Sequence, residues 1–209
     1  MYDLSHFRKN YSGKSLEINT MPANPFDWFS FWFDEAIHNE WGEANAMVLS
    51  TTDSEGKPHS RVVLLKEFSE NGFVFFTNYE SHKGKHIQAN ATVALLFFWQ
   101  KLQRQVRIEG MATKLSPQQS DNYFYSRPYE NQIAAMVSKQ SQPLESKEKL
   151  LQEYEKLLKE QNAIRPCNWG GYIIKPFYFE FWQGQPNRLH ERVVYQLENS
   201  NWIKYLLYP

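Results

Sequence analysis

Apolar positions near the start of the chain follow a helical period. Asn24-Pro25-Phe26-Asp27 combines a cap residue, a proline at the first helical position and an acid in the first turn. Aromatic and aliphatic residues then recur at helical spacing, which predicts a helix of about four turns with one apolar face turned inward. Residues 1–24 are polar and contain Pro22, so we expect a flexible N-terminal arm there.

The middle of the chain has the short apolar and β-branched runs that are typical of strands. Turn residues at Asp53–Gly56 and Asn71-Gly72 separate the first three runs, which predicts two successive hairpins. The pattern predicts strands at 46–52, 59–66, 73–77, 92–99 and 103–114. Ser81 is a possible cap for a short helix over 85–89.

Helical patterns return after residue 115. Ser116-Pro117 should open a helix that runs through Tyr123 to Arg127, Pro128 should interrupt it, and residues 131–138 should resume it. Ser146 should open a further helix with leucines on one face. Four more strands are predicted at 171–174, 177–182, 192–196 and 202–207.

The order of these elements favours one fold class. Strands do not alternate with helices, so a doubly wound parallel sheet is not expected. We predict a mainly β chain with inserted helices (α+β), built as an antiparallel barrel, with residues 25–209 forming a single domain.

Composition narrows the function classes. Of the 209 residues 42% are hydrophobic, which is enough for a large core, and 23 basic residues balance 23 acidic ones. A general nucleic-acid or acidic-membrane binder would carry a basic excess, so neither partner is expected. The histidines do not have the spacing of a zinc site, so no metal is expected. The single cysteine, Cys167, fits a reducing compartment, and the chain has no apolar run of signal-peptide or membrane-spanning length. We therefore expect a cytoplasmic protein.

Two segments place basic residues where a ligand could meet them. Arg61 and Lys66 bracket an apolar strand, and strand alternation would point them to opposite faces. Thr77 and Ser81 precede Lys83 at a helix start, which is an arrangement that can hold a phosphate. The ordinary alternatives are basic side chains that snorkel around the strand, and a simple helix cap at Ser81.

A third segment suggests a phosphate clamp. Tyr123 and Arg127 are four residues apart, so they should share one helix face, which Asn131 would continue if the helix persists. An ordinary surface pair is the alternative. The loop Ser138-Lys-Gln-Ser141 is rich in donors but generic by itself.

The most informative segment is Phe179-Glu-Phe-Trp182-Gln followed, after four residues, by Arg188-Leu-His190-Glu-Arg192. Period-2 spacing would put Arg188, His190 and Arg192 on one face. Three possible cations there would repel one another unless an anion lay against them. An exposed edge strand is the alternative.

That segment resembles the signature of the pyridoxamine 5′-phosphate oxidase family. The other segments follow in the family's order: the Arg61–Lys66 strand, Phe76-Thr77, Lys83, Arg104-Gln-Val106, Tyr-(x)3-Arg-Pro, Val137–Ser141 and Trp169-Gly-Gly171. The resemblance spans roughly residues 8–209. It implies an FMN-binding split β-barrel that works as a homodimer.

The resemblance also implies a set of site residues. FMN would be held by Arg61, Val62, Val63, Leu64, Leu65 and Lys66, by Phe76, Thr77, His82 and Lys83, and by Gln105, Gln140, Ser141, Trp182 and Arg192. The substrate would be bound by Lys66, Tyr123, Arg127 and Asn131 at its phosphate, by Arg188, Leu189 and His190 near the reacting carbon, and by the arm residues Arg8, Lys9, Asn10 and Tyr11.

The implied reaction oxidises pyridoxamine or pyridoxine 5′-phosphate to pyridoxal 5′-phosphate. Our hypothesis is hydride transfer from C4′ of the substrate to flavin N5, with dioxygen as the final acceptor and hydrogen peroxide as product. Arg188 and His190 are the expected catalytic residues. Three positions depart from the family pattern: His82 where arginine is common, Asn131 where serine is usual, and Leu206 in place of a terminal arginine.

Two other readings remain open. One is a split-barrel flavoprotein of different chemistry, such as a flavin reductase, which need not keep Tyr123, Arg127, Arg188 and His190. The other is a binding module that stores or delivers FMN or pyridoxal phosphate. Retained FMN without turnover would favour the second.

Overall fold

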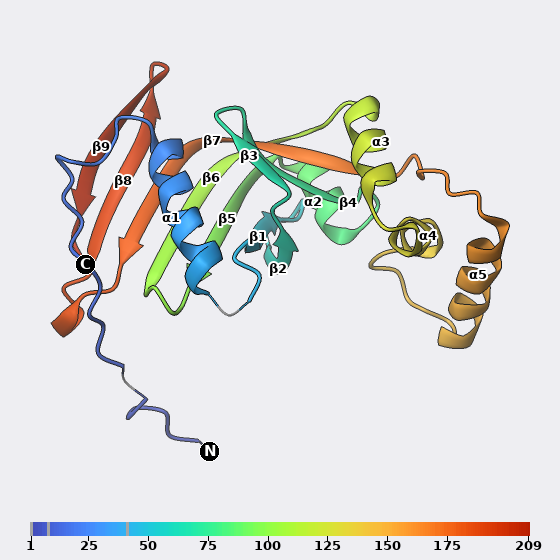
Figure 1. The fold of residues 1–209 in the computed structure, drawn as a ribbon, viewed down its shortest axis with the longest axis horizontal. Coiled ribbons are helices and arrows are strands. Elements are labelled where there is room, and N and C mark those ends of the chain that lie inside the picture. The colour runs from blue at the N-terminus through green and yellow to red at the C-terminus, as the bar shows by residue number, and fades with distance from the viewer. Residues whose placement is uncertain (1, 8, 41) are drawn as a thin grey trace. The chain divides into compact units, whose positions relative to one another are not determined.

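The computed structural model describes residues 2–7, 9–40 and 42–209. Its helices are α1 (Pro25–Asn39), α2 (His82–Ala89), α3 (Pro117–Ser126), α4 (Tyr129–Val137) and α5 (Lys147–Glu160), with a short 3-10 helix at Pro186–Arg188. Its strands are β1 (Ala46–Thr52), β2 (Pro58–Leu64), β3 (Glu67–Ser69), β4 (Gly72–Asn78), β5 (Thr92–Trp99), β6 (Arg104–Lys114), β7 (Trp169–Gln183), β8 (Glu191–Glu198) and β9 (Asn201–Leu207) (Figure 1). The predicted mainly β class with inserted helices is confirmed.

The chain forms two compact units. Unit 1 comprises Met1–Leu49, Ala94–Gly110 and Pro176–Pro209, and unit 2 comprises Ser50–Val93 and Met111–Lys175. Hydrogen bonds join the strands in the order β2-β1-β5-β6-β7-β4-β3, and β8 and β9 continue from β7. The antiparallel pairing of β7 with β4 covers residues 169–174, whereas its pairing with β8 covers residues 178–183.

Helix α1 fills the core of unit 1. Its start follows the sequence, since the Asn24 side chain accepts a hydrogen bond from the amide of Phe26 and Pro25 occupies the first turn. Phe29 and Trp32 are fully buried. The ring of Phe29 lies 5.2 Å from that of Phe97, between centroids, and the ring of Trp32 lies 5.4 Å from that of Phe181. These edge-on aromatic contacts fix the strands that follow in the chain.

Unit 2 combines the hairpin β3–β4 with the first half of β7 and with four helices. Strand β4 is buried along almost its whole length, and Thr77 pairs with Gly170 in the ladder. Directly after this strand, Ser81 caps α2 by accepting a hydrogen bond from the amide of Gly84. The buried strand β4 therefore fixes the position of the first turn of α2.

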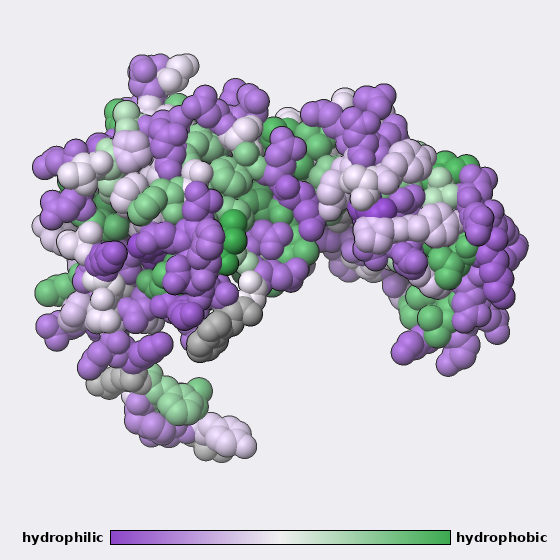
Figure 2. Space-filling view, in the orientation of Figure 1, coloured by the Kyte–Doolittle hydropathy of each residue, from purple (hydrophilic) through white to green (hydrophobic). Residues whose placement is uncertain are grey.

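Helices α3 and α4 are separated by a break at Arg127 and Pro128. A capping box formed by Ser116 and Gln119 opens α3, and Pro128, which cannot donate an amide hydrogen bond, separates the two. Helix α5 follows in the chain and has no fully buried residue. Figure 2 shows mainly hydrophilic side chains over α5, as its alternating lysines and glutamates predict.

Two predicted strands are a single strand. The sequence pattern predicts separate strands at 171–174 and 177–182, but β7 runs through both. Pro176 falls between the stretch paired with β4 and the stretch paired with β8, where a missing amide interrupts neither ladder. The second hairpin also differs, because β2 ends at Leu64 and a short extra strand, β3, follows it.

None of the helices in the described part of the chain is both long and apolar enough to cross a membrane.

Candidate functional site

A cavity of about 870 Å³ opens in unit 2. Its walls come from β2, β4, α2, α3, α4, the loop after α4 and the start of β7. Four cationic side chains line it, Arg61, Lys66, Lys83 and Arg127, and none of the described residues that line it is an aspartate or glutamate. Like charges held together in this way raise the energy of the empty cavity, so its chemistry favours an anionic ligand.

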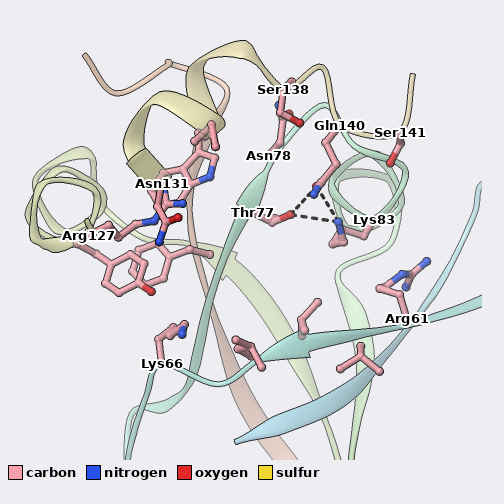
Figure 3. Close-up of a pocket in the computed structure, with 18 of the residues that line it drawn as sticks. Arg61, Lys66, Thr77, Asn78, Lys83, Arg127, Asn131, Ser138, Gln140 and Ser141 are labelled. Carbon is pink, nitrogen blue, oxygen red and sulfur yellow. Dashed lines mark hydrogen bonds between the residues drawn. The ribbon is translucent and has the colours of Figure 1, made fainter. Parts of the chain in front are cut away.

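Lys83 stands in the first turn of α2, where the helix dipole is also positive. Its Nζ donates hydrogen bonds to Gln140 Oε1 at 2.9 Å, Thr77 Oγ1 at 3.2 Å and Ser81 Oγ at 3.3 Å. Thr77 also donates to Gln140, and the three side chains form the triangle of dashed lines in Figure 3. Burial, and then the positive charge of Arg61, lower the pKa of Lys83 to about 8. An anion beside Lys83 would stabilise its protonated form and so raise its pKa again.

Arg61 and Lys66 both line this one cavity, so the expectation that they point to opposite faces is wrong. Strict alternation ends with β2 at Leu64, two residues before Lys66. Arg61 is held in place, since its Nη1 donates to Thr51 Oγ1 at 2.8 Å and to the carbonyl of His59 at 2.9 Å. Burial lowers the pKa of Arg61.

A second group of donors occupies another part of the cavity. Arg127, Asn131 and Lys66 gather on one side in Figure 3, whereas Thr77, Lys83 and Gln140 lie on the other. The Nη1 atom of Arg127 is buried and has no hydrogen-bond partner among the described residues. Burial lowers the pKa of Arg127. An unpaired buried guanidinium nitrogen is costly unless a ligand accepts its hydrogen bond.

Tyr123 and Arg127 do meet in the cavity, but not through one continuous helix. Helix α3 ends at Ser126, Arg127 is its extended C-cap residue, and Asn131 belongs to the separate helix α4. The extended conformation at Arg127 is the one that a following proline favours. The break at Pro128 therefore places these three side chains together on one wall.

A stack of aromatic rings forms another wall. The ring centroids of Phe76 and Tyr123 lie 3.8 Å apart, and the ring of Trp169 lies parallel to that of Tyr123, at 2°. The guanidinium carbon of Arg127 lies 4.8 Å from the centroid of Trp169. Gly171 permits this packing, because a Cβ there would come within 2.8 Å of the Phe76 ring.

Sequence reasoning named Trp169 only as part of a motif and did not give it a place in the site. The glycines that follow it were an available signal, because glycine within a strand often marks a site where a ligand or another backbone approaches closely. Other lining residues that were missed are Asn78, Pro128, Ala134, Ala135 and Ser138.

Trp182, His190 and Tyr11 form a cluster in unit 1. The ring centroids of Trp182 and His190 are 4.7 Å apart, and the ring of Tyr11 lies 5.6 Å from that of His190. The amide of Gln185 donates to His190 Nδ1 at 3.1 Å, so a neutral ring carries its proton on Nε2. Burial, and then the charge of Arg188, lower the pKa of His190. The neutral ring is the state that this geometry stabilises.

The expectation that Arg188, His190 and Arg192 alternate on one strand face is wrong. Arg188 lies in the 3-10 turn with a positive φ of 62°, and β8 begins only at Glu191. The anion that faces Arg192 is the carboxylate of Glu180, which is 3% exposed and accepts a hydrogen bond from Arg192 Nε at 2.8 Å. Burial acts to raise the pKa of Glu180, but hydrogen bonds from Arg192 and Arg107 outweigh it and the pKa is lowered.

The remaining candidates are placed as follows. Val62, Val63, Leu64, Phe76, His82 and Ser141 line the cavity in unit 2, whereas Leu65 is buried at 4% exposure and does not line it. Gln105 is half-buried on β6 in unit 1, and Leu189, Lys9 and Asn10 are exposed there. Arg8 lies outside the described residues.

Comparison with known proteins identifies related sequences over most of the chain. A family model described as pyridoxamine 5′-phosphate oxidase matches residues 33–160. A second, described as the pyridoxine 5′-phosphate oxidase C-terminal dimerisation region, matches residues 169–209. Two similar curated proteins are named pyridoxine/pyridoxamine 5′-phosphate oxidase. The one from Cytophaga hutchinsonii is 48% identical over 99% of both chains, and the one from Chromohalobacter salexigens is 46% identical over 100% of this chain and 99% of its own.

Among solved structures, PhzG from Burkholderia lata, in complex with tetrahydrophenazine-1-carboxylic acid, is similar with a TM-score of 0.90. It is 26% identical, and the match covers 96% of this chain and 100% of that one. The predicted split β-barrel fold class is confirmed by this likeness.

Proposed function

Because the chain belongs to the pyridoxamine 5′-phosphate oxidase family, we propose that it oxidises pyridoxamine or pyridoxine 5′-phosphate to pyridoxal 5′-phosphate with FMN as its cofactor. One observation supports this proposal: two groups of cationic and hydrogen-bond-donating side chains share a cavity in which no described lining residue carries a carboxylate. Cofactor and substrate each bring a phosphate, so this reaction requires two such groups.

The FMN phosphate would bind at the start of α2. Lys83, Thr77 and Gln140 already form a hydrogen-bonded triangle. Arg61 and His82 line the same cavity. A phosphate here would receive hydrogen bonds in place of those that the triangle makes internally. It would also meet the positive end of the helix dipole. These residues therefore fit a phosphate-bearing flavin.

The substrate phosphate would bind between Arg127, Lys66, Tyr123 and Asn131. The buried Nη1 of Arg127 has no hydrogen-bond partner among the described residues, so a phosphate oxygen would accept a hydrogen bond that this donor otherwise lacks. Asn131 stands where serine is usual in the family, and its amide can still donate to a phosphate oxygen. Val62, Val63 and Leu64 supply the apolar surface along which ring systems can lie.

The chemistry that bound FMN supplies is acceptance of a hydride and reoxidation by dioxygen, which yields hydrogen peroxide. We assign His190 a role in orienting the substrate: its Nδ1 accepts from the Gln185 amide, so the Nε2–H of the neutral ring can donate a hydrogen bond to the substrate's amine nitrogen or hydroxyl oxygen. Arg188 supplies a positive charge that orients the substrate. With the amine substrate, hydrolysis of the imine product releases ammonia.

For FMN, the family resemblance also implies Gln105, Trp182 and Arg192, which belong to unit 1. Glu180 fixes the orientation of Arg192, and the Arg192 Nη1 atom donates to the carbonyl of Tyr208 at 3.1 Å. This contact ties the last residues of the chain to Arg192, although the arginine common near the family's C-terminus is absent. The description of residues 169–209 as a dimerisation region supports a homodimer.

The direct test is anaerobic mixing of the FMN-loaded protein with pyridoxamine 5′-phosphate, followed by admission of air. We expect the flavin absorbance to bleach and then to recover, with pyridoxal 5′-phosphate and hydrogen peroxide formed in equal amounts. A flavin that stays oxidised with both the amine and the alcohol substrate would refute the oxidase function and leave the carrier or another flavoprotein chemistry.

The lowered pKa of Lys83 predicts that the dissociation constant for FMN depends on pH. A phosphate dianion stabilises the protonated amine, so binding above the pKa of about 8 must be accompanied by proton uptake. The dissociation constant for FMN should therefore change little between about pH 7 and pH 8, then rise by up to about tenfold per pH unit above that. Quenching of FMN fluorescence measures it.

Three variants sharpen this measurement. Lys83→Arg should bind FMN with no rise at alkaline pH, because arginine stays charged there. Lys83→Met should bind weakly at every pH. Lys85→Met, which removes an exposed lysine from the same helix, should keep the wild-type profile. A wild-type profile in Lys83→Met would contradict the assignment.

Replacement of Arg127 tests the substrate-phosphate site. Arg127→Met should lower kcat/KM for pyridoxamine 5′-phosphate by about a hundredfold, since hydrogen bonds between charged groups contribute about 1.5–3 kcal/mol each. The FMN content should not change. The matched control is unphosphorylated pyridoxamine, for which wild type and variant should differ far less. An equal loss with both compounds would mean that Arg127 does not bind the phosphate.

A further inference from the structure

The N-terminal arm is fastened to unit 1 along residues 11–21. The amide of Gly13 donates to the carbonyl of Gly184 at 3.1 Å, and the amide of Ser12 donates to Gln103 Oε1 at 2.8 Å. Lys204 Nζ donates to the carbonyl of Ile18 at 2.8 Å. The arm therefore runs beside the turn that leads from β7 to β8. The flexibility of residues 1–24 stays a prediction.

The carboxylate of Glu191 is where three segments meet. Its Oε1 accepts a hydrogen bond from Ser15 Oγ at 2.6 Å, and its Oε2 accepts from the amide of Leu16 at 2.6 Å and from Gln185 Nε2 at 3.0 Å. Two of these donors belong to the arm and one belongs to the turn. Short hydrogen bonds to a carboxylate are about twice as strong as those between neutral groups.

The same contacts determine what surrounds His190. Gln185 donates its amide to His190 Nδ1 while its side chain donates to Glu191 and to the carbonyl of Lys14. Four residues before Ser15, the ring of Tyr11 lies 5.6 Å from His190 and 5.8 Å from Trp182, edge-on to both. The hydrogen bonds of the residues that follow Tyr11 therefore hold this part of the arm beside His190 and Trp182.

We propose that Glu191 is a positioning residue, whose carboxylate latches the arm to the turn and to β8 and so keeps Tyr11 against His190. This inference rests on the proposed function, in which His190 acts on the substrate and Tyr11 helps to bind it. Glu191 itself touches neither the substrate nor the cofactor in this account. Its effect on turnover is exerted through the positions of Tyr11 and Gln185.

Trypsin cleavage after Lys14 reports the latch without any reference to activity. The carbonyl of Lys14 accepts a hydrogen bond from Gln185, and the next residue, Ser15, donates to Glu191. A protease must extract this stretch of backbone, so cleavage requires release of the arm. Cleavage within α5, where Lys149 and Lys156 are exposed, provides the internal reference.

Glu191→Ala should accelerate cleavage after Lys14 by about tenfold or more, since it removes acceptors for three donors. It should lower kcat/KM for pyridoxamine 5′-phosphate by about tenfold, mainly through KM, with wild-type FMN content and thermal midpoint. Glu191→Gln should restore most of the protection, because its oxygen still accepts from Leu16 and its amide can donate to Ser15 Oγ. Glu198→Ala, at the exposed far end of β8, is the matched control.

Each result decides the proposal. Unchanged cleavage after Lys14 in Glu191→Ala overturns the latch, and faster cleavage with unchanged kcat/KM overturns its role in the reaction. If Glu191→Ala does not fold, Ser15→Ala removes one donor and should give a smaller change in the same direction; no change would overturn the latch. If the wild type oxidises neither substrate, the proposed function fails, and the proteolysis result still shows whether Glu191 holds the arm.

Discussion

The cavity in unit 2 concentrates positive charge without a compensating carboxylate among the described residues that line it. Arg61, Lys66, Lys83 and Arg127 converge there in a chain whose acidic and basic residues are equal in number. The effect is visible in Lys83, whose pKa falls to about 8, and in Arg127, whose buried Nη1 has no partner in the described structure. An anion bound in this cavity would offset the repulsion between these cations.

In unit 1, three arginines are paired with carboxylates of the protein itself. Glu180 receives hydrogen bonds from both Arg107 and Arg192, so the protein supplies the counter-charge itself. Arg104 is paired with Glu35 in the same unit. Arg104 and Arg107 therefore have a counter-charge within the protein, whereas the cations that line the cavity in unit 2 have none among the described lining residues. This contrast explains why a formal net charge of zero is compatible with a strongly cationic site.

Local sequence signals predicted most elements, because the interactions that define them lie within a few residues. The caps at Asn24, Ser81 and Ser116 mark where α1, α2 and α3 begin, and the apolar run at 92–99 matches β5 at both ends. The family resemblance then brought the cavity residues together. These parts needed no knowledge of the tertiary structure.

Local signals failed where distant partners decide the geometry. Pro176 does not end β7, because its two neighbouring stretches pair with different strands. Period-2 spacing failed for Arg188 because a 3-10 turn precedes β8. Glu180 was part of a recognised motif, but its pairing with Arg107, 73 residues away in the sequence, has no local signature. The role of Glu191 as an acceptor for the arm was hidden for the same reason.

The central claim is that this cavity requires phosphate, and the equilibrium binding of FMN and riboflavin to the apoprotein tests it most directly. The two ligands share the flavin ring and differ in the phosphate group. We predict that FMN binds at least about a hundredfold more tightly than riboflavin, and that the advantage shrinks as salt screens the cations. Equal affinities, or an advantage that salt does not change, would contradict the account.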